Sequence, residues 1–151
     1  MTTNHPFRSL QSRCLEPGKY SSHLERWLNY YKSQALHIVD GEELKYDPVS
    51  VLNRLQHFLN IKPFVDYSDK LKFDRKKGFF CRAAEDDDGG QPKCLGKGKG
   101  RQYPNMDVES QNFLRDYYRL SNEALLKLLN RLGYSIPDWL EDELKDNRTS
   151  N

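Results

Sequence analysis

The residues best suited to chemistry lie between Lys76 and Pro104, where two cysteines are followed by glycines that alternate with cations. Cys81 and Cys94 enclose an acidic, glycine-containing loop, and residues 96–101 read GKGKGR. Glycine lets backbone N–H groups point into a concavity, and the neighbouring Lys and Arg side chains add positive charge. This pattern predicts a hairpin stapled at its two cysteines that leads into a loop able to bind a phosphate or sulfate group.

The sequence leaves the state of the three cysteines open. A bridge between Cys81 and Cys94 would enclose the twelve residues 82–93, would stabilise the fold by about 3 kcal/mol in the chain-entropy model, and would imply an oxidising compartment. The alternatives are three reduced thiols or a metal site. No CxxC pair or histidine cluster accompanies the cysteines, so we expect no metal. Cys14 has no assigned role.

Composition limits the class of protein. The 151 residues are enough for one compact unit or for part of a larger domain. A net charge of +2 and a pI near 8.4 do not indicate a dedicated nucleic-acid-binding protein. No apolar run approaches the roughly 18 residues that a membrane-spanning helix needs. Any anion-binding site must therefore be local.

Three elements are expected before the cysteines. Helical spacing predicts an amphipathic helix over Lys19 to Lys32, with an inward stripe of Tyr20, Leu24, Trp27, Leu28 and Tyr31. The apolar run Ala35 to Val39 predicts a buried strand that ends in a turn at Asp40 and Gly41. Asp47 followed by Pro48 predicts a helix start, and that helix should end near Asn60 with Val51, Leu52, Leu55, Phe58 and Leu59 facing inward. Residues 62–80 should form a surface connection into the first arm of the hairpin.

Helices are expected after the hairpin. Asp107 should cap one helix with Phe113, Leu114, Tyr117 and Tyr118 inward, and Asn122 should cap a second that carries Leu125, Leu128, Leu129 and Leu132 and stops at Gly133. A short final helix should begin at Pro137 and pack through Trp139, Leu140 and Leu144. With a single predicted strand, the chain looks like part of an α/β fold, because one strand cannot make a sheet.

Six segments carry a resemblance to a known family: RCLEPGKYSSHLERWL, LHIVDGEEL, FDRKKGFFC, CLGKGKGRQYP, FLRDYY and IPDWLEDEL. In this order they resemble the C-terminal half of the sulfotransferase domain of heparan sulfate N-deacetylase/N-sulfotransferases. The resemblance implies an α/β fold: the C-terminal portion of a P-loop-type sulfotransferase fold, mostly helical, with few strands and a disulfide-stapled hairpin loop. It divides the chain into an irregular segment 1–12, a sulfotransferase portion 13–145 and a polar tail 146–151.

The resemblance implies an activity. A sulfuryl group would be transferred from 3′-phosphoadenosine 5′-phosphosulfate, without a metal, to glucosamine amines of a heparan sulfate or heparosan chain. It also implies the Golgi lumen, with a membrane anchor elsewhere in the parent protein, and as partners the N-terminal half of the domain and a deacetylase domain. The phosphosulfate loop and the catalytic base lie upstream in the family, so the isolated chain is expected to be inactive.

Site residues follow from the resemblance by position. Cys81 and Cys94 match the family's disulfide, and Lys99 matches a cation that stabilises charge during transfer. The matched cofactor contacts are Phe80, Lys99, Gly100, Arg101, Gln102 and Tyr103. His23 and Arg26, on the outer face of the first helix, are candidate glycan contacts, with a solvated helix face as the competing interpretation. The tryptophans and the Tyr117–Tyr118 pair are expected in the core rather than in a ligand site.

Some residues depart from the family pattern. The loop 82–93 is longer and more acidic, and Gly98 and Gln102 stand where a hydroxyl and a Lys are usual. An acidic loop should repel a sulfated chain that lies near it. A second interpretation is therefore a non-catalytic module that binds heparan or another polyanion through Lys76, Lys77, Lys93, Lys97, Lys99 and Arg101.

Overall fold

The computed structural model describes residues 11–84, 92–96 and 103–145 of the chain. They fall into two compact units. Unit 1 is drawn from Met1–Leu36 and Asn105–Asn151, and unit 2 from His37–Pro104. Segments from both ends of the sequence thus build unit 1, and the middle of the chain builds unit 2.

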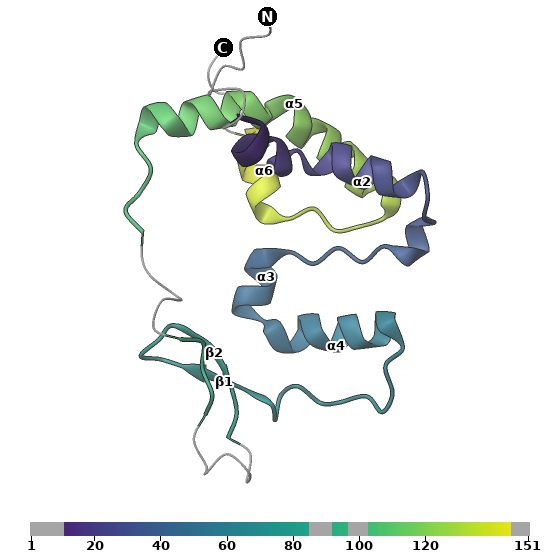
Figure 1. Cartoon of the computed structure of the whole chain (residues 1–151), viewed down its shortest axis with the longest axis vertical. Helices are drawn as coiled ribbons and strands as arrows, with labels where there is room; N and C mark the ends of the chain where they lie inside the picture. Colours follow the sequence, from purple (N-terminus) through teal and green to yellow (C-terminus); the bar gives the residue numbers. More distant parts are fainter. Residues whose placement is uncertain (1–10, 85–91, 97–102, 146–151) are drawn as a thin grey trace, which may run out of the picture. The chain divides into compact units, whose positions relative to one another are not determined.

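Unit 1 is helical. Its elements are the π-helical turn η1 (Gln11–Leu15), the 3₁₀ turns η2 (Glu16–Gly18) and η3 (Ser33–Ala35), and the helices α2 (Tyr20–Leu28), α5 (Val108–Leu132) and α6 (Asp138–Lys145). Helix α2 lies along α5, and α6 packs against α5 (Figure 1). Among the described residues of this unit, the buried apolar side chains are Leu125, Leu128, Leu129 and Leu140. They come from the two predicted C-terminal segments, so this part of the core is confirmed.

The two helices expected after the hairpin are one helix. Helix α5 runs for 25 residues through Ser121 and Asn122, where a break was expected. No Gly or Pro lies within it, and Ser or Asn alone costs a helix interior only a few tenths of a kcal/mol. The Ser21 hydroxyl also donates to the Ser121 carbonyl at 3.2 Å, which ties α2 to this point. Packing against α2 therefore outweighs the local capping preference.

Four of the predicted helix ends are confirmed, at Asp47, Asn60, Asp107 and Gly133. The Asp107 side chain accepts a hydrogen bond from Ser110 N at 2.8 Å, and Gly133 follows the helix with φ 75°. The Asp47 side chain caps α4 (Pro48–Leu59), which ends at left-handed Asn60. The first helix, by contrast, stops at Leu28 rather than Lys32. Caps that act through neighbouring backbone groups are thus readable from the sequence.

Unit 2 contains α3 (Gly41–Tyr46), α4 and a two-stranded antiparallel sheet of β1 (Leu71–Asp74) and β2 (Phe79–Arg82). Helix α3 packs against α4 and also contacts β2. The strands pair Phe73 with Phe80 and Lys72 with Cys81. Gly78, with φ 73°, closes the turn between them. The predicted surface connection thus contains a strand of its own, and the chain is mostly helical with few strands, as the resemblance implied.

The strand expected over Ala35 to Val39 does not form. Ala35 ends η3, and residues 36–39 pair with no strand in the described part of the chain. Their backbone is nevertheless extended at both ends, with φ −103° and ψ 137° at Leu36 and φ −72° and ψ 129° at Asp40. Asp40 caps α3 by accepting a hydrogen bond from Glu42 N at 3.1 Å, which replaces the expected turn. A strand needs a paired neighbour, and none of the described residues supplies one.

Several side chains expected to face inward are exposed. They are Tyr20, Trp27 and Tyr31 on or after α2, Phe58 and Leu59 on α4, and Phe113 on α5. On α4 the buried positions include Gln56, whose amide donates to the Val65 carbonyl at 2.6 Å and accepts from Val65 N at 2.8 Å. Periodicity predicted the helices but not which of their faces the chain covers. No helix in the described part is long and apolar enough to cross a membrane.

Candidate functional site

A disulfide joins Cys81 of β2 to Cys94, as the resemblance implied. Cys81 is buried and only 3% exposed, whereas Cys94 is half-buried. Beside it, Arg82 N donates to the Lys93 carbonyl at 2.9 Å and Lys93 N donates to the Arg82 carbonyl at 3.1 Å. These two hydrogen bonds form an antiparallel bridge. The predicted closed loop is thus held at its base by both a covalent bond and a backbone bridge.

The aromatic side of the hairpin is built by cross-strand neighbours. The Phe80 ring meets the Phe73 ring edge-on, with ring centroids 5.3 Å apart. Such a pair contributes about 0.5–1.5 kcal/mol beyond its buried area. Because successive side chains of a strand point to opposite faces, Phe80 lies on the face opposite the disulfide. Phe80 is half-buried and so retains an accessible surface.

Asp74 lies at the end of β1, next to the disulfide. Its Oδ1 accepts hydrogen bonds from Lys76 N at 2.8 Å and Lys77 N at 3.1 Å, which fixes the turn that follows. Its Oδ2 lies 3.9 Å from Cys94 Sγ. A disulfide sulfur carries no proton, so this contact is not a hydrogen bond. The run DRKKG is a recognisable turn signal in the sequence, but nothing in it indicates that Asp74 lies beside the disulfide.

Asp74, Cys81 and Cys94 are the described residues whose grouping comes nearest to a metal site, because their ligand atoms lie within 4.8 Å of one another. Metal binding by cysteine requires thiolates. Both sulfurs are instead bonded to each other. The group therefore offers only one carboxylate as an ionic ligand.

The glycine and lysine run is described only at its edges. Gly96 is exposed, and a Cβ added there would meet nothing within 4 Å, so space is open beside it. Tyr103 is 74% exposed. The predicted residues Lys99, Gly100, Arg101 and Gln102 lie outside the described residues, as does the acidic part of the loop before Cys94. Phe80, just before the first cysteine of the disulfide, and Gly96, shortly after the second, thus both have accessible surface.

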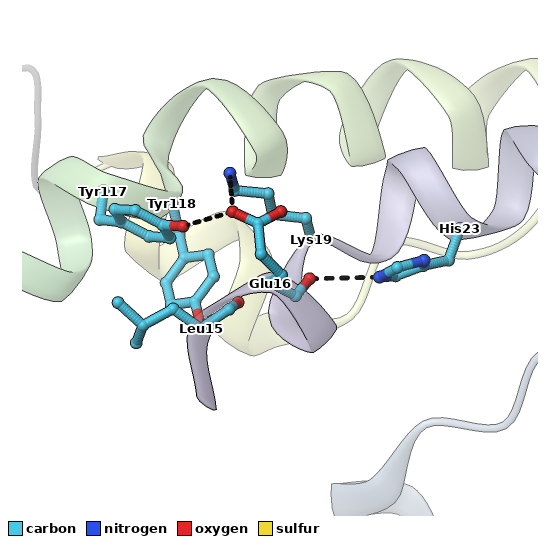
Figure 2. Close-up of polar contacts among 6 residues, drawn as sticks. All are labelled: Leu15, Glu16, Lys19, His23, Tyr117 and Tyr118. Atoms are coloured by element: carbon cyan, nitrogen blue, oxygen red, sulfur yellow. Dashed lines mark hydrogen bonds and ion pairs between the residues drawn. The ribbon is translucent and has the colours of Figure 1, made fainter. Parts of the chain in front are cut away.

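The two candidate glycan contacts lie in unit 1, on α2. The ring nitrogen Nε2 of His23 lies 3.1 Å from the Glu16 carbonyl oxygen (Figure 2). A carbonyl only accepts, so Nε2 carries the proton in this contact. Arg26 is exposed in the last turn of the helix. One ring nitrogen of His23 is thus hydrogen-bonded to the backbone of η2, while Arg26 remains accessible to solvent.

A polar cluster at η2 joins the start of unit 1 to α5 (Figure 2). Glu16 Oε1 accepts hydrogen bonds from the Lys19 ammonium at 2.8 Å and from the Tyr117 hydroxyl at 2.9 Å. The Tyr118 hydroxyl donates to the Leu15 carbonyl at 2.7 Å. The sequence predicts that the two tyrosines lie in the packed interior, but it does not predict this cluster. Its partners are about a hundred residues apart along the chain, and no local pattern relates them.

The electrostatics of this cluster follow its hydrogen bonds. The Lys19 ammonium and then the Tyr117 hydroxyl lower the pKa of Glu16 below its ordinary value. The hydrogen bond to Glu16 raises the pKa of Lys19 in turn. Burial raises the pKa of the Tyr118 hydroxyl. Each shift favours the protonation form that makes these hydrogen bonds, so the pKa directions agree with a cluster that attaches η2 to α5.

Unit 1 also has a pocket of about 390 Å³. Its lining residues are Gly18, Tyr20, Met106, Gln111, Leu114, Arg115, Tyr118, Asn122, Trp139 and Glu143. Two of them, Arg115 and Glu143, form an ion pair at 3.0 Å that joins α5 to α6. None of the predicted site residues in the described part of the chain lines this pocket. All of its lining residues belong to unit 1.

Comparison with known proteins places these features in a family. The sequence model of the sulfotransferase domain matches residues 3–133. The bifunctional heparan sulfate N-deacetylase/N-sulfotransferase of Drosophila melanogaster is 54% identical over 138 residues, which are 91% of this chain and 13% of that protein. Heparan sulfate N-deacetylase/N-sulfotransferase 2 of Bos taurus is also 54% identical over 138 residues, or 91% of this chain and 15% of that protein.

A further relative extends the match. Heparan sulfate N-deacetylase/N-sulfotransferase 4 of Mus musculus is 49% identical over 149 residues, covering 96% of this chain and 17% of that protein. The chain thus spans 13–17% of the length of these three curated relatives. The resemblance carried by the six motifs is confirmed. With 131 of its residues inside the matched domain (3–133), the chain belongs to the sulfotransferase domain family.

Proposed function

We propose that this chain is the C-terminal part of a heparan sulfate glucosamine N-sulfotransferase domain with a P-loop-type fold. The observation that carries the proposal is the identity of about half of all residues over 91% of the chain to proteins named for that activity. The alternative of a non-catalytic polyanion-binding module gains no support from the comparisons, because the curated relatives named above are described as sulfotransferases. The parent protein would transfer a sulfuryl group from 3′-phosphoadenosine 5′-phosphosulfate to glucosamine amines.

The hairpin of unit 2 would form one wall of the donor site. Phe80 would present its ring to the nucleotide, and Lys99 to Tyr103 would contact the phosphates through backbone N–H groups and cations. The open space beside Gly96 and the accessible surfaces of Phe80 and Tyr103 are compatible with such a ligand. The disulfide would keep Phe80 and the glycine and lysine run at a fixed spacing. Preorganised groups of this kind need no rearrangement during the reaction.

Lys99 would hold its ammonium where negative charge develops on the leaving oxygen. The donor supplies the activated sulfuryl group, and the protein contributes position and charge, as in phosphoryl transfer. Lys suits the role because its charge is compact. No metal is needed for this chemistry. His23 and Arg26 are proposed as acceptor contacts, with the exposed Arg26 guanidinium suited to a carboxylate or sulfate of the glycan.

The full protein would work in the Golgi lumen. The Cys81–Cys94 disulfide supports an oxidising compartment, since such bonds are rare where thiols are kept reduced. The partners would be the heparan sulfate or heparosan chain, the preceding half of the sulfotransferase domain and, as in the bifunctional relatives, a deacetylase domain. Residues 36–39, which pair with no described strand, fit a chain that completes its sheet with that preceding half.

A chimera tests the proposal. The matching stretch of the Bos taurus relative would be replaced by this chain, and transfer of labelled sulfate to N-deacetylated heparosan would be measured. We expect activity in the chimera and a loss of about 100-fold or more on Lys99→Ala, which removes one charge-stabilising donor. Lys127→Ala, at an exposed position of α5, is the matched control. A chimera that binds 3′,5′-ADP but transfers no sulfate would contradict the proposed activity.

A further inference from the structure

We propose that the Asp74 carboxylate protects the Cys81–Cys94 disulfide from reduction, by repelling thiolates from Cys94, the sulfur at which they attack. The proposal concerns the chemistry of the disulfide itself and does not depend on the proposed enzymatic function. It rests on three features of the described residues: the unequal burial of the two sulfurs, the position of one carboxylate oxygen, and the hydrogen bonds that hold the other.

The two sulfurs are not equally accessible. Cys81 lies in β2 and is 3% exposed, while Cys94 lies outside the named strands and is half-buried. A thiolate must approach along the sulfur–sulfur axis from outside the bond. Approach to Cys81 would have to pass through the packed side of the hairpin. The geometry therefore directs attack to Cys94.

The carboxylate stands beside that point of attack. Asp74 Oδ2 lies 3.9 Å from Cys94 Sγ. The other oxygen is held by Lys76 N at 2.8 Å and Lys77 N at 3.1 Å, so the side chain cannot swing away without losing two hydrogen bonds. An approaching thiolate carries the same charge as this carboxylate, and like charges at such short range repel each other, more strongly near a protein surface than in bulk water. Every thiolate that reaches Cys94 meets this repulsion.

The step protected against is ordinary thiol–disulfide exchange. The attacking thiolate forms a bond to Cys94 Sγ, the Cys81–Cys94 bond breaks, and the electron pair leaves on Cys81 Sγ, which then takes a proton from water. A second thiolate releases Cys94, and two molecules of monothiol leave as their own disulfide. Negative charge spreads over three sulfurs during the first step. Asp74 destabilises both the approach and this transition state.

Cations of the same hairpin act in the opposite sense. Lys72, Lys76 and Lys77 are exposed on it, and Arg82 and Lys93 flank the disulfide. They attract anionic reagents to the region as a whole. The effect of Asp74 must therefore be measured as a change between variants that share these cations, and not as an absolute rate.

The test uses the full chain carrying Cys14→Ser, because Cys14 is an exposed free thiol that would itself exchange with disulfides, including the mixed disulfide formed with the reagent. Rates of reduction by anionic 2-mercaptoethanesulfonate and by cysteamine, whose ammonium offsets its thiolate charge, are compared for Asp74 and Asp74→Asn. Asn keeps an oxygen for the two backbone N–H groups and removes the charge. Asp66→Asn is the matched control, since Asp66 caps a turn in the same way through Ser68 N at 2.9 Å.

We expect Asp74→Asn to accelerate reduction by 2-mercaptoethanesulfonate by about fivefold or more and by cysteamine by about twofold or less. The control should change neither rate. In the Cys14→Ser chain that keeps Asp74, acid quenching and peptide mass spectrometry should find the first adduct on Cys94. An unchanged rate, equal acceleration by both reagents, the same acceleration in Asp66→Asn, or an adduct on Cys81 would each overturn the proposal.

Discussion

Gly18 packs so closely against the Tyr118 phenol that no side chain fits at position 18. A Cβ there would lie 2.6 Å from Tyr118 Oη and 2.8 Å from Cε1 and Cζ. The same hydroxyl donates a hydrogen bond to the carbonyl of Leu15, which lies 103 positions earlier in the sequence. The short segment before α2 is thereby fixed on α5. The glycine of the EPG motif is required by this contact rather than by its backbone angles.

Gly18→Ala should therefore destabilise unit 1 by about 1–3 kcal/mol through overpacking. Both tryptophans of the chain, Trp27 and Trp139, lie in unit 1, so their fluorescence during denaturant unfolding reports this unit. Gly41→Ala is the control, because a Cβ there meets nothing within 4 Å. In a Tyr118→Ala background, Gly18→Ala should cost little. A full loss of stability in that background would show that the contact is not the cause.

Among the described residues of unit 1, Leu140 is the most buried, at 0% exposed, and it lies on α6, which packs against α5. Leu140→Ala should lower the free energy of unfolding by about 2–5 kcal/mol, because it removes apolar contacts and leaves a cavity. Leu120→Ala, at a position that is 68% exposed, should change it by about 0.5 kcal/mol or less. Similar losses for the two variants would mean that α6 does not pack as described.

Gln56 is a buried polar side chain that fixes the segment after α4. It is 6% exposed and makes two hydrogen bonds with the backbone of Val65. Gln56→Met keeps the size but leaves both Val65 groups without these partners, at a cost of about 1–3 kcal/mol. Hydrogen exchange at residues 61–67 should accelerate, while exchange in α5 should not. Gln56→Glu should have an intermediate effect, because it retains only the bond from Val65 N.

The sequence predicted what depends on neighbouring residues. Asp47 and Asp107 begin helices, and Asn60 and Gly133 end them, because caps act within one turn. The predictions from the sequence were wrong where packing between distant residues decides the secondary structure. Ser121 and Asn122 continue a helix since α2 contacts it there, and residues 36–39 pair with no strand among the residues that the structure describes.

The same distinction, between local patterns and contacts of residues distant in sequence, applies to the candidate site. The disulfide was predicted from the family's motif, because a cysteine pair keeps its meaning wherever the motif recurs. Asp74 was missed because its importance comes from its distance to Cys94, 20 positions away in sequence. The roles of Lys99 and Tyr103 stay predictions. Short-range chemistry and motif identity were thus readable, whereas contacts between distant residues required the structure.

The Glu16 cluster predicts a pH dependence. Its hydrogen bonds lower the pKa of Glu16 from its ordinary value of 4.5. A carboxyl with a depressed pKa in the folded state contributes stability that is complete above the unfolded value and is lost as pH falls through the folded value. The unsubstituted chain should therefore have a higher free energy of unfolding than Glu16→Gln. This difference should be constant near neutral pH and should decrease below about pH 4.5. Tryptophan-monitored unfolding across this range, with exposed Asp116→Asn as control, would measure it. A difference that grows on acidification would have the wrong sign.

The disulfide should couple the stability of unit 2 to ligand binding. Replacing both Cys81 and Cys94 by Ser removes the cross-link over residues 82–93, which should cost about 3 kcal/mol. Hydrogen exchange in β1 and β2 should then accelerate. If the proposed donor site is correct, calorimetry should also show weaker binding of 3′,5′-ADP, because Phe80 and the glycine and lysine run lose their fixed spacing. Cys14→Ser, which leaves the disulfide intact, should alter neither measurement. Faster exchange with unchanged nucleotide binding would separate the two roles, since the disulfide would then stabilise the hairpin without organising a donor site.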